Sequence, residues 1–392
     1  MKKEIVWFGL LLFLFLATGQ RTGAAEMKGQ IGEPGEQQIE TQVGNALMEE
    51  LNLGQAQESL DELLGKNNFS LTQAVSKLMR GELPWNLDTL KSIAKEALFG
   101  EVDSYRKTAV YLLVIIVASA VFSNFITVFD KGQIADISYY TMYLLMITLL
   151  MKVFSSMTQV AQSAVAAVLT FMEALLPACL VTLYLSSGSI TAMGFYQLTL
   201  WAVAGVQWVL DSLLLPGVQI YVLLLFINQL MKEDYLSKMA DLIKTGILWS
   251  LKSMTAVLFG MQAIQCMAAS GVDQMKTSVI NKAVSAIPGI GGAYETVTQT
   301  VLGSAVVLKN AVGIAGVAAL VILGLVPVVK LAFGALFYRA LGAVAQPVTD
   351  KRVSECIACV AEGGEILLKI VLHAGILFMI SLAMITVMVR GG

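Results

Sequence analysis

Of the 392 residues in this chain, 57% are hydrophobic and only 14% are charged, whereas an average soluble domain has about 25% charged residues. The net charge of −2 favours neither a nucleic-acid partner nor an acidic substrate. The run from Ala174 to Met231 has Asp211 as its only formal charge, and each half is long enough to cross a bilayer, because about 20 apolar residues span the hydrocarbon core. This pattern excludes an ordinary soluble protein and predicts several membrane-spanning helices.

The first 25 residues have the pattern of a secretory signal peptide. Lys2 and Lys3 precede an apolar run over residues 5–17, and the small residues Gly23 and Ala25 occupy positions −3 and −1 of a cleavage site. We therefore expect cleavage after Ala25, with the following residues outside the cytoplasm.

Residues 26–107 are predicted to form a small helical extracytoplasmic head. This segment contains fourteen acidic and eight basic residues. Residues 70–73, Ser-Leu-Thr-Gln, have the pattern of a capping box and predict a helix with Val75, Leu78 and Met79 facing inward. A segment of about 80 residues has only a small core, so the head is expected to fold against the membrane body or partners and to offer a docking surface.

Residues 108–392 are predicted to form an all-α, polytopic membrane helix bundle with about seven or eight spans. Residues 271–310 differ, because their uncharged runs are twelve or thirteen residues long, which suits a re-entrant or interfacial hairpin better than a full span. The candidate re-entrant residues are Pro288, Gly289, Gly291 and Gly292. The expected spans lie near residues 108–129, 137–154, 160–185, 190–215, 217–231, 245–267, 311–329 and 370–389.

The placement of lysine and arginine predicts the orientation of the bundle, since cytoplasmic loops carry an excess of these residues. With the head outside, Lys276, Lys282 and Lys309 fall on the extracytoplasmic side. Eight spans put the C-terminus outside as well, and one span fewer or more, from a miscounted hairpin, reverses this. The residues expected on the cytoplasmic side are Lys131, Lys232, Lys238, Lys244, Lys330, Arg339, Lys351 and Arg352.

Three charged residues inside predicted spans are candidates for lining a transport pathway, because ionisable groups in a membrane are costly. They are Glu173, Asp211 and Lys252. Glu173 lies four residues before Pro177, where a proline frees a backbone carbonyl and favours a polar position inside the bundle. The alternatives are a carboxylate at the interface for Asp211 and a lysine that extends toward the interface for Lys252.

The last predicted helix carries a second candidate group, a polar face. Glu362, Glu365, Lys369 and His373 are spaced by three, four and four residues and so share one side of a helix. This face is interpreted either as the solvated end of a span or as a surface toward a cavity or partner.

The sequence predicts no catalytic, cofactor or metal site. Cys356 and Cys359 form a CxxC pair without the second pair of ligands that a zinc site needs, so two small residues on a helix face are the simpler interpretation. The chain contains no phosphate-binding loop and no HExxH motif, and its single histidine limits acid–base chemistry. We therefore do not expect an enzyme.

Small residues favour close helix packing in lipid. Ala256 and Gly260 form one small-xxx-small pair, and Ala315 and Ala319 form another beside Gly313 and Gly316. A homo-oligomer is compatible with this pattern.

Two glycine-rich segments carry a resemblance to a known family. They are residues 286–292, Ala-Ile-Pro-Gly-Ile-Gly-Gly, and residues 301–313, which contain Leu-Lys-Asn-Ala-Val-Gly. Together with the leading signal peptide and the acidic head, they resemble the stage III sporulation protein AE family of endospore-forming bacteria over essentially the full length.

The resemblance implies a location and partners. Members of the family belong to an eight-protein stage III AA-to-AH assembly in the mother-cell membrane surrounding the engulfed forespore. That assembly joins the forespore stage II sporulation protein Q, includes an ATPase supplied in trans, and is similar in parts to specialised secretion systems. The resemblance implies a channel subunit with a permease-like core and supplies no catalytic residue.

Two other functions stay open from the residues alone. The first is a stand-alone secondary transporter or permease that uses the intramembrane charges for coupling. The second is an intramembrane enzyme, which the missing motifs disfavour. A coupled transporter is expected to lose activity when one carboxylate becomes its amide, whereas a subunit is expected to tolerate that change.

Overall fold

The computed structural model describes residues 51, 53–64, 69–82, 133–187, 189–231, 234–285, 291–347, 349 and 351–387. It also describes the single residues 91, 93, 95, 110, 111, 113, 114, 117, 118 and 121. For residues 64, 133–139, 187, 189–193, 195, 266–285, 291–300, 302 and 384–387 this description covers the backbone only. Over this part of the chain the regular structure is helical, without a strand, which confirms the all-α prediction. The predicted signal peptide, most of the predicted head and most of the first span lie outside the described residues.

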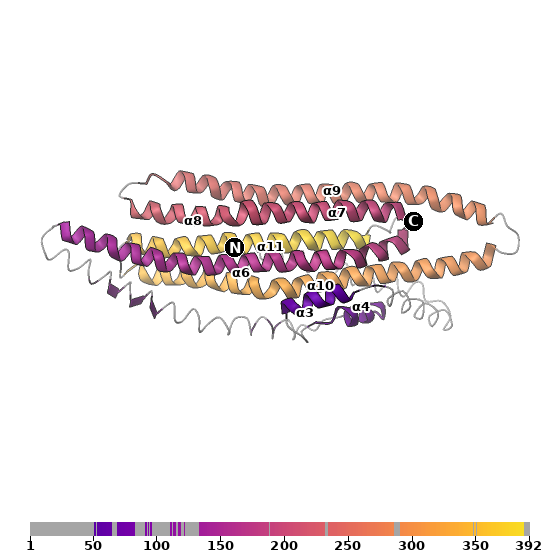
Figure 1. Ribbon diagram of the computed structural model, residues 1–392, viewed down its shortest axis with the longest axis horizontal. Helices are drawn as coiled ribbons and strands as arrows, with labels where there is room; N and C mark the ends of the chain where they lie inside the picture. Colours follow the sequence, from indigo (N-terminus) through magenta and orange to yellow (C-terminus); the bar gives the residue numbers. More distant parts are fainter. Residues whose placement is uncertain are drawn as a thin grey trace.

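Long helices lie side by side along one axis (Figure 1). The described residues contain five helices that are long and apolar enough to cross a membrane, and they mark the chain as a multi-pass membrane protein. The second of the five is made of α7, η1 and α8. The elements are α6 Gln133–Ser187, α7 Ser189–Val209, η1 Leu210–Leu214, α8 Leu215–Leu230, α9 Ser237–Ser285, α10 Gly291–Ala345 and α11 Lys351–Val387.

The predicted count of seven or eight spans is not confirmed, because the helices are longer than single spans. The predicted spans 137–154 and 160–185 lie in one uninterrupted helix, α6, which has 55 residues. At a rise of 1.5 Å per residue this helix is about 80 Å long, more than twice the hydrocarbon thickness. The predicted span 137–154 ends two residues after Lys152, but the helix continues through this region.

A helix break predicted at Pro216-Gly217 is also absent. The helical path continues from α7 through the π-helix η1 into α8, where Pro216 stands in the first turn. A proline lacks a backbone N–H and crowds the carbonyl four residues before it, and one wider π turn absorbs this change without ending the helix. The predicted spans 190–215 and 217–231 therefore form one continuous path.

The helix termini alternate between the two ends of the bundle. The starts of α6, α9 and α11 and the ends of α8 and α10 lie at one end, and the end of α9 and the start of α10 lie at the other (Figure 1). The predicted re-entrant segment, residues 271–310, falls mostly within α9 and α10. Of its candidate residues, Gly291 and Gly292 begin α10, while Pro288 and Gly289 lie outside the described residues.

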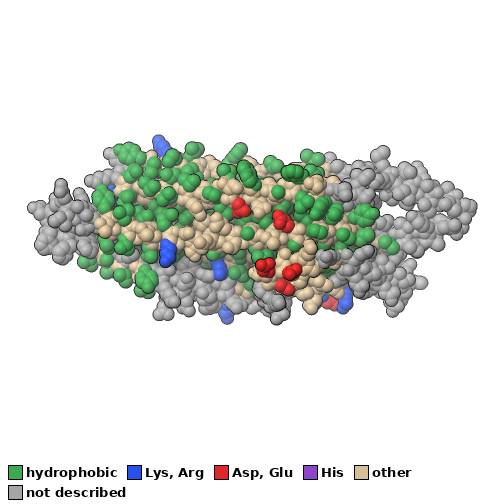
Figure 2. All heavy atoms as spheres, in the orientation of Figure 1, with side chains coloured by type: hydrophobic (Ala, Val, Ile, Leu, Met, Phe, Trp, Pro, Cys, Tyr) green, Lys and Arg blue, Asp and Glu red, His purple; other side chains and the backbone are tan. Residues whose placement is uncertain are grey.

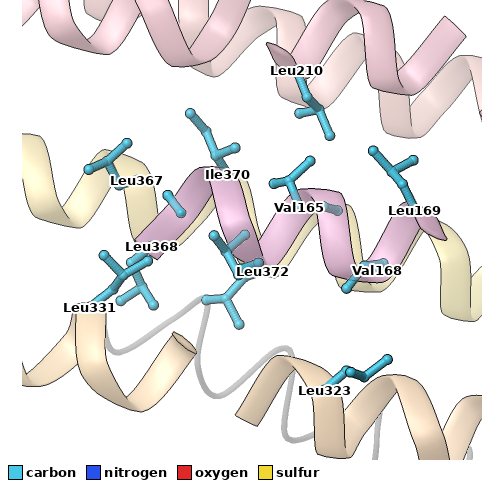
Figure 3. Close-up of a cluster of buried hydrophobic side chains, with 14 of the residues drawn as sticks. Val165, Val168, Leu169, Leu210, Leu323, Leu331, Leu367, Leu368, Ile370 and Leu372 are labelled. Atoms are coloured by element: carbon cyan, nitrogen blue, oxygen red, sulfur yellow. The ribbon is translucent and has the colours of Figure 1, made fainter. Parts of the chain in front are cut away.

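The core is a continuous set of aliphatic side chains between α6, η1, α10 and α11. Figure 3 shows its middle, where Val165 and Leu169 of α6 lie near Leu210 of η1 and Ile370 of α11. Leu210 and Ile370 have no exposed surface. More than half of the most apolar stretch of α6, α10 and α11 is buried, so these three helices form the centre of the bundle.

Two short helices pack on the outside of this bundle, α3 Gly54–Leu64 and α4 Leu71–Met79. α3 contacts α6, and α4 contacts α10. The predicted cap is confirmed, since Ser70 Oγ accepts a hydrogen bond from the backbone N–H of Gln73 at 3.3 Å. Gly81 lies two residues after the end of α4 and has a left-handed φ of 76°. Its backbone N–H donates to Leu78 O and so satisfies a carbonyl of the last turn.

The outer surface of the bundle is largely apolar. Figure 2 shows hydrophobic side chains spread along the described part of the visible face, with few charges among them. Trp201, Trp208 and Trp249 are each at least 66% exposed. An exposed apolar surface of this extent is the surface expected of a protein whose solvent is lipid.

Candidate functional site

The polar face of α11 meets three other helices at one level of the bundle. Glu362 and Glu365 lie three residues apart, so both face the same side of α11. Each makes an ion pair to a different helix, Glu362 to α9 and Glu365 to α10. The predicted polar face is therefore the place where α8, α9, α10 and α11 are joined by side-chain contacts.

Glu362 is the centre of this group. Its Oε2 atom accepts a hydrogen bond from Tyr221 Oη of α8 at 2.8 Å and another from Lys244 Nζ of α9 at 3.1 Å. The same ammonium lies 5.6 Å from the centroid of the Tyr221 ring, within the range of a cation–π contact. Tyr221 is buried, whereas the side chains of Lys244 and Glu362 are 35% and 45% exposed, so solvent weakens this ion pair.

The second ion pair joins α10 to α11. Arg339 Nη1 of α10 donates to Glu365 Oε1 at 2.6 Å. The arginine side chain is 60% exposed and the glutamate side chain only 18%. Because exposed ion pairs contribute about 0–1 kcal/mol, this contact orients α10 against α11 more than it stabilises them.

Two glycines between the glutamates bring the helices close together. A methyl group at Gly363 would collide with Val222 of α8 and would lie 2.6 Å from Phe154 of α6. A methyl group at Gly364 would lie 2.5 Å from Met157 Cε of α6. Small residues that allow such close approach are typical of helix contacts in membranes. The sequence-based predictions missed this glycine pair, although two successive glycines inside a helix are the signal that could have found it.

The other two residues of the predicted face stay on their own helix. His373 Nδ1 lies 2.8 Å from the backbone oxygen of Lys369. Since a carbonyl oxygen only accepts, the hydrogen in this bond is on Nδ1. The four residues thus share one side of α11 as predicted, and Glu362 and Glu365 are the two that form the described ion pairs to other helices.

The three pathway candidates lie on the outer surface of the bundle. The side chains of Glu173, Asp211 and Lys252 are all exposed. Glu173 therefore does not occupy the polar position inside the bundle that its distance from Pro177 suggested. Asp211 stands in the π-helix η1. Their role in a transport pathway remains a prediction.

The cysteine pair is part of the core. Cys356 is fully buried and Cys359 is 5% exposed, and Cys356 Sγ lies 3.8 Å from Tyr143 Oη of α6. Among the described side chains, no group of three His, Cys, Asp or Glu residues could hold a metal ion.

The connection from α8 to α9 is closed by one asparagine. Asn228 Nδ2 donates to Asp234 Oδ1 at 2.7 Å, and Asn228 Oδ1 accepts from the backbone N–H of Leu236 at 2.9 Å. Hydrogen bonds from Asn228 and Ser237 lower the pKa of Asp234 below its ordinary value. This connection lies next to the cluster around Glu362, because Lys244 follows in the first turns of α9.

Comparison with known proteins places the chain in a family. The family described as stage III sporulation protein AE matches residues 69–389. The chain belongs to the stage III sporulation protein AE family. It is 22% identical to the stage III sporulation protein AE of Bacillus subtilis (strain 168) over 390 residues, which cover 98% of this chain and 97% of that protein. No solved structure matches the chain.

The family match fits the architecture of the bundle. It begins at Phe69, directly before α4, and includes all of α6 to α11. The region that the family shares in this chain is thus the helical bundle together with the short helix that packs on α10. The resemblance carried by residues 286–292 and 301–313 is confirmed.

A second polar group, which the sequence-based predictions missed, lies between α9 and α11. Gln262 Nε2 donates to Ser381 Oγ at 2.8 Å, and both residues are buried. Gln265, one turn further along α9, is 8% exposed. Two glutamines three residues apart in an otherwise apolar run are a signal that could have found this group.

Lys309, which was predicted on the extracytoplasmic side, lies within α10 and is 1% exposed. Its helix starts at the end of the bundle where α9 and α10 connect, opposite the end that holds Lys351 and Arg352.

Proposed function

We propose that this member of the stage III sporulation protein AE family is a non-enzymatic membrane subunit of a sporulation-specific, secretion-like transport complex. The complex links the mother cell and the forespore. The proposal rests on the family match over residues 69–389 together with five helices able to cross a membrane.

The distribution of basic residues supports an orientation for the subunit. Lys238 and Lys244 lie in the first turns of α9, and Lys351 and Arg352 begin α11. These helix ends share one end of the bundle (Figure 1), and positive residues favour the cytoplasm. We place this end in the mother-cell cytoplasm and the connection between α9 and α10 in the space between the two membranes. The head, which contacts α6 and α10 through α3 and α4, faces that space.

The architecture supports a part in an assembly. A helix of about 80 Å is longer than the bilayer is thick, so the bundle extends into the aqueous space on at least one side, where other proteins can bind it. The proposed partners are the other stage III AA-to-AH proteins, including an ATPase that supplies energy, and stage II sporulation protein Q of the forespore. The mother-cell membrane around the engulfed forespore is the proposed location.

The experiment that tests this function is affinity purification of the tagged chain from membranes of sporulating cells. The expected result is co-purification of the other stage III proteins, with loss of heat-resistant spores when the gene is deleted. A matched sample from vegetative cells that express the same tagged chain controls for non-specific membrane proteins. A chain that purifies alone from sporulating cells and catalyses transport alone in liposomes contradicts the proposal and favours a stand-alone transporter.

Neutralising the exposed carboxylates separates the same two functions. Glu173→Gln and Asp211→Asn are each expected to leave the number of heat-resistant spores within about twofold of the parent, because exposed substitutions change stability by about 0.5 kcal/mol or less. The measurement is a spore count after heating, with membrane abundance of each variant checked by blotting. A severe loss of spores from one normally abundant amide variant would favour proton- or ion-coupled transport.

A further inference from the structure

α9 is the least covered of the five long helices. Only 22% of its most apolar stretch is buried, against 61% for α11. Its outer face presents Leu242, Trp249, Val257 and Ile264, each at least 67% exposed. The helix therefore lies on the outside of the bundle, and only a narrow inner face fixes its position.

Polar contacts hold this inner face at two levels. Lys244 Nζ pairs with Glu362, and Gln262 Nε2 donates to Ser381 Oγ. The two contacts are about 27 Å apart along α9 at the rise of an α-helix. In lipid the hydrophobic effect does not drive helices together, because the lipid tails are as apolar as leucine, and helices are held by van der Waals packing and by interhelical hydrogen bonds. Both polar contacts therefore add to the packing that attaches α9.

The contact at Gln262 leaves polar atoms without partners. Gln262 Oε1 and both polar atoms of Gln265, Nε2 and Oε1, are buried and form no hydrogen bond with the described residues. A buried amide without hydrogen-bond partners is unfavourable, and more so in the bilayer core, where no water is present to bond it. Because the two glutamines share one face of α9, a movement of α9 away from α11 would expose these atoms together.

We propose that α9 is the movable wall of a polar path, and that the seam between α9 and α11 binds uncharged, hydrogen-bonding solutes. Gln262, Gln265 and Ser381 line this seam, and water is the smallest such solute. In the structure Gln262 bonds to Ser381, and we assign this arrangement to the closed state of the path. When α9 moves away from α11, the bond between Gln262 and Ser381 is lost. The unpaired amide atoms of Gln262 and Gln265 then form hydrogen bonds with the entering solute, and these bonds offset the loss.

The chemistry of the three side chains defines the solute class. Two carboxamides and one hydroxyl offer both donors and acceptors, and none carries a formal charge. Such a lining bonds amides, hydroxyls and water, and gives a charged solute no counter-ion. This inference rests on the proposed transport function and assigns a location to its path.

Thiol reactivity of the purified full chain in lipid nanodiscs tests the seam. The native residues Cys179, Cys266, Cys356 and Cys359 are first replaced by alanine, and Gln265→Cys is then exposed to a small polar methanethiosulfonate. Leu258→Cys is the matched control, because Leu258 is also on α9 and is 7% exposed, against 8% for Gln265. We expect the cysteine at 265 to react at least about tenfold faster than that at 258, because polar reagent enters only with water. Equal rates at the two positions overturn the proposal.

A second variant keeps the test independent of cysteine chemistry. Gln265→Leu removes both unpaired amide atoms and makes the seam more apolar. The expected result is a higher thermal midpoint in detergent, normal co-purification with the stage III proteins and a loss of heat-resistant spores. A stabilised Gln265→Leu chain that supports normal sporulation overturns the seam and leaves the proposed function intact. Failure of the parent chain itself to co-purify or to support sporulation would instead contradict the proposed function.

Discussion

Gly363→Ala is expected to destabilise the bundle by about 2 kcal/mol, because inserting a methyl group into a packed core costs about 1–3 kcal/mol. The added methyl group would meet Val222 and Phe154, which come from two different helices. These helices have to separate from α11 to admit it. Gly363→Val is expected to cost more, and the measurement is the thermal midpoint of the detergent-solubilised chain.

Gly375 provides the control within the same helix. A methyl group at Gly375 would meet no atom within 4 Å. Gly375→Ala is therefore expected to be neutral or to stabilise the chain by up to about 1 kcal/mol, the difference in helix propensity between glycine and alanine. If both alanine variants melt at the same temperature, the close contact of α11 with α6 and α8 is wrong.

Glu362→Ala is expected to cost about 2 kcal/mol, chiefly because it leaves the hydroxyl of Tyr221 without its acceptor inside the protein. Tyr221 is 1% exposed, so water does not replace the lost carboxylate easily. Glu362→Gln keeps an acceptor for Tyr221 and removes only the charge. Its expected cost is about 1 kcal/mol or less, because the partly exposed ion pair with Lys244 is screened by solvent.

A double-mutant cycle separates the two contacts of Glu362. Lys244→Met and Glu362→Gln, alone and combined, give the coupling energy of the ion pair. The exposed pair of Lys351 and Glu355, at 3.6 Å within α11, is the control, and we expect a coupling of about 0.3–0.5 kcal/mol there. A Glu362→Gln variant as unstable as Glu362→Ala would show that the hydrogen bond from Tyr221 is not the main contribution of Glu362 to stability.

The sequence predicted the class of this protein because its main signals are local. The uncharged run around Asp211 requires lipid, and the spacing of Glu362 and Glu365 places both on one side of α11. The cap at Ser70 depends on residues three positions apart. Each of these three features depends only on residues that are close together in the chain, so it can be found in a single sequence.

The partners of these residues could not be predicted, because they are distant in the sequence. Tyr221 lies 141 residues before Glu362, and Gln262 lies 119 residues before Ser381. No periodicity connects such positions. The pair of Gly363 and Gly364 is visible in the sequence, but the neighbours of Gly363, Val222 and Phe154, lie on two other helices and are not.

The number of spans was not confirmed for a different reason. The hydrocarbon core sets the length that a helix needs in order to span it, but it sets no upper limit on that length. α6, with 55 residues, continues beyond a single hydrocarbon thickness. Pro216 is a break in most soluble helices, but here the π turn before it keeps the path helical. Length rules alone therefore divide α6, and the path from α7 to α8, each into two predicted spans.

We expect that the continuous long helices carry the chain across the membrane, so that the two ends of the bundle lie on opposite sides. Single cysteines at Asp234, between α8 and α9, and at Gly289, between α9 and α10, test it most directly in a chain without its native cysteines. A membrane-impermeant thiol reagent applied to sealed vesicles of known orientation is predicted to label the two positions from opposite sides. Labelling of both positions from the same side would contradict it.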